Sequence, residues 1–112
     1  MTARLTSEFR VKAALRRVHA AGGSAMVLRR GDATAGAILV VALDRGGPAA
    51  LLERGIGPDG APALIRTGPT SGESTAVTDY WQRRGLSDPD LWVIELDVAD
   101  AERFAAETIA AN

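Results

Sequence analysis

The chain contains no cysteine among its 112 residues and only one histidine, His19. The absence of cysteine excludes disulfide bonds, cysteine nucleophiles and thiolate metal sites. With one histidine in the sequence, any mechanism that needs a histidine base would have to use His19. Zinc sites nearly always use cysteine or several histidines. We therefore expect no zinc site, and we predict no cofactor.

Long apolar runs are lacking as well. The longest, residues 37–43, is far shorter than a bilayer span, so we expect no membrane segment. The first residues carry Arg4 and Glu8 ahead of an amphipathic segment and form no apolar stretch of the secretory type, so we expect no signal peptide. Because a chain without cysteine suits a reducing compartment, we expect a cytoplasmic location.

The composition is that of an ordinary globular protein. Hydrophobic residues make up 46% of the chain and charged residues 24%, which indicates neither disorder nor a fibrous class. A chain of 112 residues is long enough for one core and too short for two. We therefore predict a single domain over residues 1–112.

Charge is divided along the chain, although the formal net charge is −1. Residues 1–30 stand at +6 and residues 31–112 at −7. Either the basic end binds an anionic partner such as nucleic acid, or the two ends pair in the fold. Nucleic-acid modules usually carry a net positive charge, which favours pairing. The arginines that would form a nucleic-acid or anion surface are Arg10, Arg16, Arg17, Arg29 and Arg30.

Apolar periodicity predicts the element order α-β-β-β-β-α-β-α. Apolar positions 11, 14, 15 and 18 indicate a first helix over residues 7–21, ended by Gly22 and Gly23. A second helix is expected up to about residue 84 with Gly85 as its cap, and a third is expected after Asp97 as its N-cap. Strands are predicted at residues 24–30, 35–44, 49–54, 63–66 and 91–96.

These elements indicate an α/β fold of the α+β type, a mixed, mostly antiparallel sheet covered by three helices. Strand 35–44 is apolar on both faces, which predicts a central position and favours helices on both faces of the sheet. Pro62 indicates that strand 63–66 lies at an edge. Short connections predict that the first four strands form a meander. The expected core consists of Val11, Leu15, Val18, Val27, Ile38, Val40, Leu52, Val77, Trp81, Trp92, Ile94 and Ile109.

Several segments resemble one known family. They are the opening Met1–Leu5, the helix end Arg16–Gly23, the strand Val27–Asp32 and above all Asp88–Asp97, with the sequence Asp-Pro-Asp-Leu-Trp-Val-Ile-Glu-Leu-Asp. Together they resemble domain of unknown function 1491, an uncharacterised family of alphaproteobacterial proteins of about this length. The resemblance spans nearly the whole chain and implies a bacterial, cytoplasmic origin. It implies no activity and no functional residues.

Two polar segments invite a chemical interpretation. The loop Gly68–Thr75 superficially resembles a phosphate-binding loop, but its glycine spacing is one residue short and Glu73 stands where lysine is required. The acids Asp88, Asp90, Glu95 and Asp97 do not have the spacing of a calcium loop. Turn and capping roles account for them better than a metal or catalytic role.

A further polar cluster follows in the second helix. Tyr80, Arg83 and Arg84 could clamp a nucleotide or a single strand, with Trp81 beside them. The spacing of Trp81 from the apolar Val77 favours a core position for the tryptophan, and its neighbours then form a solvated flank.

The function that fits best is a non-enzymatic binding or protein-interaction module. Its partner is unidentified, and a homodimer through strand 63–66 or an apolar helix face is one form it would take. The alternative is a nucleic-acid or nucleotide binder that uses the basic N-terminal third. An enzyme ranks third, because no nucleophile, base and electrophile come together among sequence neighbours.

Overall fold

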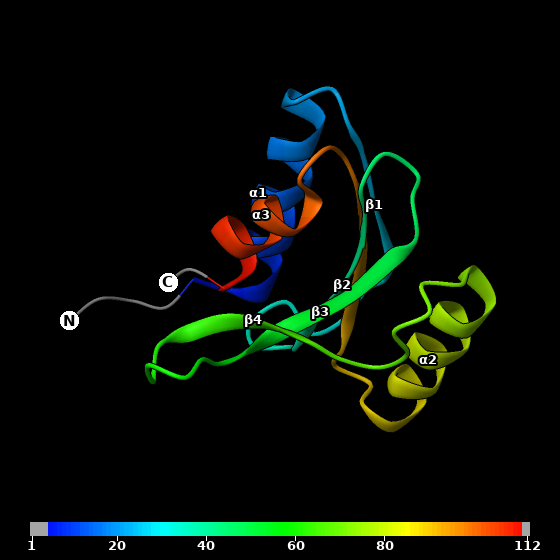
Figure 1. The fold of residues 1–112 in the computed structure, drawn as a ribbon. Helices are drawn as coiled ribbons and strands as arrows, with labels where there is room; N and C mark the ends of the chain where they lie inside the picture. The colour runs from blue at the N-terminus through cyan, green and yellow to red at the C-terminus, as the bar shows by residue number, and fades with distance from the viewer. Residues whose placement is uncertain (1–4, 111–112) are drawn as a thin grey trace.

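A five-stranded mixed sheet forms the centre of the fold in the computed structural model, which describes residues 5–110 (Figure 1). The predicted element order and the α+β class are confirmed. Met1–Arg4, which belong to the basic third and to the resemblance, lie outside the described residues. The elements are α1 (Ser7–Ala20), β1 (Ser24–Arg29), β2 (Ile38–Leu43), β3 (Ala49–Ile56), β4 (Pro62–Arg66), α2 (Ser74–Ser87), β5 (Trp92–Asp97), α3 (Ala101–Ala105) and the π-helical turn η1 (Ala106–Ala110).

The strands lie in the order β1-β5-β2-β3-β4. β2 is central and β4 is an edge strand, as predicted. The predicted four-strand meander is wrong, because β5 lies between β1 and β2, antiparallel to β1 and parallel to β2. β5 is buried at four of its six residues, whereas β1 has none that is fully buried. The more apolar strand therefore takes the position that is covered on both faces, and β1 is displaced to the edge.

Helices cover both faces of the sheet, with α1 and α3 on one side and α2 on the other (Figure 1). The register sets Ile38 opposite Trp92 and Val40 opposite Leu52, so these side chains meet in the larger core, under α1, α3 and η1. Alternate residues of the same strands, Leu39, Val41, Leu51 and Val93, form a smaller core under α2. The apolar residues on the two faces of β2 are thus buried in the larger core on one side and in the smaller core on the other.

The expected core is confirmed at most positions. Nine of its twelve members are buried, and Leu15 and Trp81 are half-buried. Val27 is the exception, with 40% of its surface exposed. The prediction failed there because β1 is an edge strand with a neighbour on one side only.

Two predicted helix boundaries are wrong. Gly85 lies inside α2 rather than at its end, and α2 continues to Ser87. A side chain at Gly85 would overlap the guanidinium of Arg29, which donates a hydrogen bond to the Gly85 carbonyl, so glycine here makes room for a neighbour. Asp97 ends β5 instead of capping α3, and its carboxylate accepts from the amide of Gly46. Asp100, with φ 58°, precedes α3 in its place.

Candidate functional site

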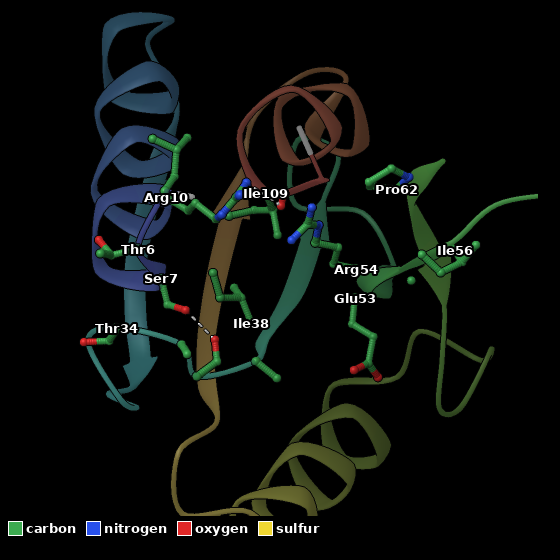
Figure 2. Close-up of a pocket in the computed structure, with 15 residues that line it drawn as sticks. Thr6, Ser7, Arg10, Thr34, Ile38, Glu53, Arg54, Ile56, Pro62 and Ile109 are labelled. Atoms are coloured by element: carbon green, nitrogen blue, oxygen red, sulfur yellow. Dashed lines mark hydrogen bonds between the residues drawn. The ribbon is translucent and has the colours of Figure 1, made fainter. Parts of the chain in front are cut away.

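A pocket of about 660 Å³ lies between the first turn of α1, η1 and the β3–β4 hairpin (Figure 2). This volume is within the range of small-molecule sites, about 300–1,000 Å³. The lining is largely apolar and draws on Ile38, Ile56, Pro62 and Ile109. Residues far apart in the chain therefore build one concave surface on the α1 face of the sheet.

Arg10 enters this pocket from α1. It is 4% exposed, because it lies one turn after Ser7 and before Ala14 on the inward face of the helix. Its Nη1 donates to the carbonyl oxygen of Ile109 at 3.2 Å, in the π-helical turn. An arginine on the buried face of a helix places a positive charge where apolar residues are usual.

Arg54 enters from β3 on the opposite side. It is half-buried and lies two residues after Leu52, so it shares the face of the sheet that α1 and η1 cover. Figure 2 shows the guanidinium groups of Arg10 and Arg54 directed into the space between α1 and β3. Glu53 is also part of the lining, but its carboxylate points to the opposite face, toward α2. Two cationic groups thus converge on one pocket.

The first turn of α1 borders the pocket, but its amides are already hydrogen-bonded. The amides of Ser7 and Glu8 donate to the carbonyls of Thr34 and Ala33 at 3.1 and 2.9 Å. The Ser7 hydroxyl donates to the Gly36 carbonyl at 2.6 Å (Figure 2). The amides of Ser7 and Glu8 and the Ser7 hydroxyl therefore already have acceptors within the protein.

The five arginines of the basic third do not share one open face. Arg10 is buried in the pocket, and Arg29 donates to the carbonyls of Gly85, Pro89 and Leu91. Arg16 is exposed on α1. The other two, Arg17 and Arg30, form ion pairs.

Those ion pairs show how the charge division is accommodated. Arg17 pairs with Glu107 at 2.7 Å, which joins the basic third to the acidic C-terminal segment. Arg30 instead pairs with Glu8 at 3.1 Å, within the basic third, and its guanidinium lies over the ring of Trp92. Pairing between the two ends is therefore present at Arg17, while Arg29 and Arg30 are satisfied by other groups.

Arg54 was missed as a site residue by the sequence reasoning, although one signal pointed to it. In a strand, residues two apart share a face. Leu52 was expected in the core, so Arg54 had to lie on the same apolar face. That Arg10 and Arg54 would line the same pocket could not be inferred from either segment alone.

Tyr80 and Arg84 of the predicted polar cluster come together, but Arg83 does not join them. Arg84 donates to both carboxylate oxygens of Glu53, at 2.7 and 3.1 Å, and to the Tyr80 hydroxyl at 2.9 Å. Hydrogen bonding to Glu53 raises the pKa of Arg84 above its ordinary value, against the lowering effect of burial. Arg83 is exposed on the outer side of α2. The cluster fastens α2 to β3.

Replacing Arg84 with methionine should lower the free energy of unfolding by about 1–2 kcal/mol. The variant leaves the half-buried carboxylate of Glu53 without its bidentate partner, and solvent access limits the loss. Urea unfolding measures it, and Arg83→Met on the exposed side of the same helix is the matched control. Equal midpoints for the two variants would contradict a fastening role for Arg84.

The ion pair of Glu8 with Lys12 depends on pH. Its carboxylate accepts from Lys12 at 2.9 Å, and Lys12 and Arg30 together lower the pKa of Glu8 below its ordinary value of 4.5. A lowered pKa in the folded state means that the stabilisation is present above the unfolded pKa and is lost as pH falls through the folded one. A ¹³C NMR titration should show the low pKa, and Lys12→Met should raise it while Arg16→Met leaves it unchanged.

The remaining sequence candidates have structural partners. His19 is exposed, and its Nε2 lies 3.2 Å from the Ala25 carbonyl. In the loop before α2, the Gly72 carbonyl accepts from the amide of Ala49. Within residues 5–110, no group of three histidine, aspartate or glutamate side chains is placed to hold a metal ion. No helix in this part of the chain is long and apolar enough to cross a bilayer.

Comparison with known proteins extends the sequence resemblance. The family model described as Protein of unknown function (DUF1491) matches residues 5–106. A crystal structure of a DUF1491 family protein from Caulobacter crescentus CB15 is 35% identical, with a TM-score of 0.80 over 90% of this chain and 94% of that one. An NMR structure of a DUF1491 family protein from the same organism is 31% identical, with a TM-score of 0.79 over 99% of this chain and 100% of that one.

A more distant likeness is the solution structure of a protein from A. tumefaciens. It is 28% identical, with a TM-score of 0.73 over 98% of each chain. None of the curated proteins matches this chain. The matches therefore extend over nearly the full length of each solved structure and carry no described activity.

Proposed function

The chain belongs to the family described as Protein of unknown function (DUF1491), a membership that assigns no activity. We propose that the protein is a non-enzymatic binding module for a small organic anion. We place the ligand in the pocket between α1, η1 and the β3–β4 hairpin. The observation that carries the proposal is the convergence of Arg10 and Arg54, from two separate elements, on one largely apolar pocket.

The electrostatics of the pocket favour an anion. Two guanidinium groups in a partly desolvated space interact with a negative charge more strongly than they would in water. Each guanidinium has five N–H donors, and the Nη1 of Arg10 donates to the Ile109 carbonyl at the edge of the pocket. The carboxylate of Glu53 is turned to the opposite face, where it pairs with Arg84, so it does not oppose an anion in the pocket.

The lining supports binding rather than catalysis. Its one serine, Ser7, is buried and donates its hydroxyl to a backbone carbonyl, and no histidine lines the pocket among the described residues. A nucleophile needs a neighbouring base to become reactive. A cytoplasmic location, which the lack of cysteine favours, belongs to the same proposal.

The geometry favours this function over nucleic-acid binding. A nucleic-acid surface needs several cations on one exposed face. Here Arg10 is buried, Arg29 is held by backbone carbonyls, and Arg17 and Arg30 are ion-paired. Retention on heparin at low salt that falls steeply with salt would revive the alternative. A homodimer through the exposed edge of β4 remains a prediction, which light scattering in solution checks.

An NMR titration tests the anion site. The ¹⁵N-labelled protein is titrated separately with inorganic phosphate, citrate and hexanoate, and the amide signals of Ile38, Gly55 and Ile109 are followed. At least one anion should shift these signals, and Arg54→Gln should abolish the shift. The control variant is Arg16→Gln, which removes an equal charge from the exposed side of α1 and should leave the shift intact. No shift with any of the three anions would overturn the proposal.

A further inference from the structure

We propose that the outer edge of β1 is a docking site for an extended, acidic segment of another protein, which would add one strand to the sheet. β1 lies at the opposite edge of the sheet from β4, so this site is separate from the pocket beside the β3–β4 hairpin. The proposal is carried by the direction of the backbone groups of β1, by its exposed apolar side chains and by the charge of α1 beside it.

The hydrogen bonds of β5 show which residues of β1 are bonded to it. The amides of Trp92 and Val98 donate toward β2, to the carbonyls of residues 37 and 43, at 2.8 and 3.1 Å. Successive residues of a strand direct their backbone groups to opposite sides, so Glu95 is directed toward β1, where its partner is Met26. Met26 is therefore bonded to β5, and the residues before and after it direct their amides and carbonyls outward.

The outward groups belong to Ala25 and Val27. The Ala25 carbonyl accepts a hydrogen bond from Nε2 of His19 at 3.2 Å. Among residues 5–110, β1 is paired with β5 alone, so no strand of this part of the chain pairs with the outward groups of Val27. Outward amides and carbonyls at a sheet edge are a template for pairing with another chain.

Both faces of this edge carry exposed apolar side chains. Val27 lies opposite Ile94 of the larger core, so it is on the α1 face of the sheet, and it is 40% exposed. Met26 is on the other face and is 51% exposed. An added strand would cover both side chains and remove their apolar area from water.

The side of α1 that lies along β1 is positively charged. His19 contacts the start of the strand, and Glu8, three helical turns earlier, binds Arg30 just beyond its end at 3.1 Å. Lys12 lies between them and also binds Glu8, and Arg16 is exposed one turn further along the helix. In this row three cations stand against the single carboxylate of Glu8. Acidic side chains on the same face of an added strand would be attracted to it.

Other occupants fit this edge less well. If two copies paired their β1 strands in antiparallel fashion about a two-fold axis, their α1 helices would lie side by side on one face. Lys12 and Arg16 would then meet the same cations of the second copy, and like charges across an interface are unfavourable. A nucleic acid would be attracted by the cations but would leave Met26 and Val27 uncovered.

Hydrogen exchange measured by NMR tests the proposal. The probe is the peptide acetyl-Val-Glu-Val-Glu-Val-Glu-Val-amide, whose glutamates would lie on the α1 face and whose valines would lie beside Met26. At saturation, the outward amides of Ala25 and Val27 should exchange at least fivefold more slowly, while the Met26 amide, which is already bonded to β5, should change little. A peptide with lysine in place of glutamate, and a peptide N-methylated at every residue, should each bind at least tenfold more weakly.

Variants of the protein separate the charge from the strand edge. Lys12→Glu should weaken peptide binding at least tenfold, and Arg83→Glu, which reverses a charge on the exposed side of α2, is the matched control and should bind as the parent protein does. Val27→Pro removes an outward amide without removing a bond to β5, and it should weaken binding at least tenfold. Val27→Glu, which would repel the peptide's carboxylates, covers the case in which Val27→Pro fails to fold.

Unchanged exchange at Ala25 and Val27, or equal binding of the lysine peptide, would overturn the proposal. Protection of these two amides that appears without peptide and grows with protein concentration would assign the edge to a second copy instead. Retention on heparin that depends on Lys12, without peptide binding, would assign it to a polyanion such as nucleic acid. Arg54→Gln should leave peptide binding unchanged, so this proposal and the anion site stand or fall separately.

Discussion

Replacing Trp92 with alanine should lower the free energy of unfolding by about 3–5 kcal/mol, the range for removing a large buried aromatic side chain. Trp92 is 1% exposed and begins β5, where it lies opposite Ile38 of the central strand. Its Nε1 donates to the Asp32 carbonyl at 2.7 Å, and Arg30 lies over its ring. The variant therefore removes core volume, a hydrogen bond and a cation–π contact together.

Urea unfolding followed by circular dichroism measures the loss. The whole stability of a domain is about 5–15 kcal/mol, so the variant should also show reduced yield of folded protein. Trp92→Phe keeps most of the ring volume but removes the Nε1 donor. This variant should lower the free energy of unfolding by about 1–2 kcal/mol. If Trp92→Ala lowers the free energy of unfolding no more than Trp92→Phe does, the packing of the ring in the larger core contributes little to stability.

Replacing Gly36 with alanine should cost about 2–3 kcal/mol, at the upper end of the range for overpacking. A β-carbon at Gly36 would overlap the carbonyl oxygen of Asp90, a backbone atom that also accepts from the amide of Asp32 at 3.0 Å. The atoms that a β-carbon at Gly36 would meet belong to the backbone of Asp90 and Asp32, so a change of side-chain rotamer cannot relieve the overlap. The loop 32–36 must shift instead.

That shift has a local readout. Backbone carbonyls of the same loop accept hydrogen bonds from the Ser7 hydroxyl and from the amides of Ser7 and Glu8. The NMR signals of Ser7 and Glu8 should therefore shift in Gly36→Ala. Gly60→Ala is the control, because Gly60 has φ 81° and open space around it and should lose only about 1 kcal/mol from backbone conformation. Equal losses in the two variants would show that the close approach at Asp90 is not maintained in solution.

Much of the architecture could be predicted from local patterns. The stripe of Val11, Ala14 and Val18 predicted α1, and the two apolar faces of β2 predicted its central position. Pro62 correctly marked the edge strand. Each of these inferences concerns which side of one element is buried, and that information is contained in the spacing of residues along a short segment.

The site was predicted only in part. Arg10 was named among the arginines of a basic surface, but the structure buries it on the inward side of α1. Arg54 was not named at all. The two residues are 44 positions apart, and they line the same pocket only because α1 packs across the face of the sheet that carries Arg54.

By itself, the sequence determined the element order, the central position of β2, the edge position of β4 and the family, because the spacing of apolar residues indicates which side of each element is buried. Only the tertiary structure decided that β5 separates β1 from β2, that Gly85 lies within α2 beneath Arg29, and that Arg10 faces Arg54. These outcomes depend on which surfaces pack together most favourably over the whole chain. Local periodicity is compatible with several such pairings, so the total burial and hydrogen bonding of the folded state select among them.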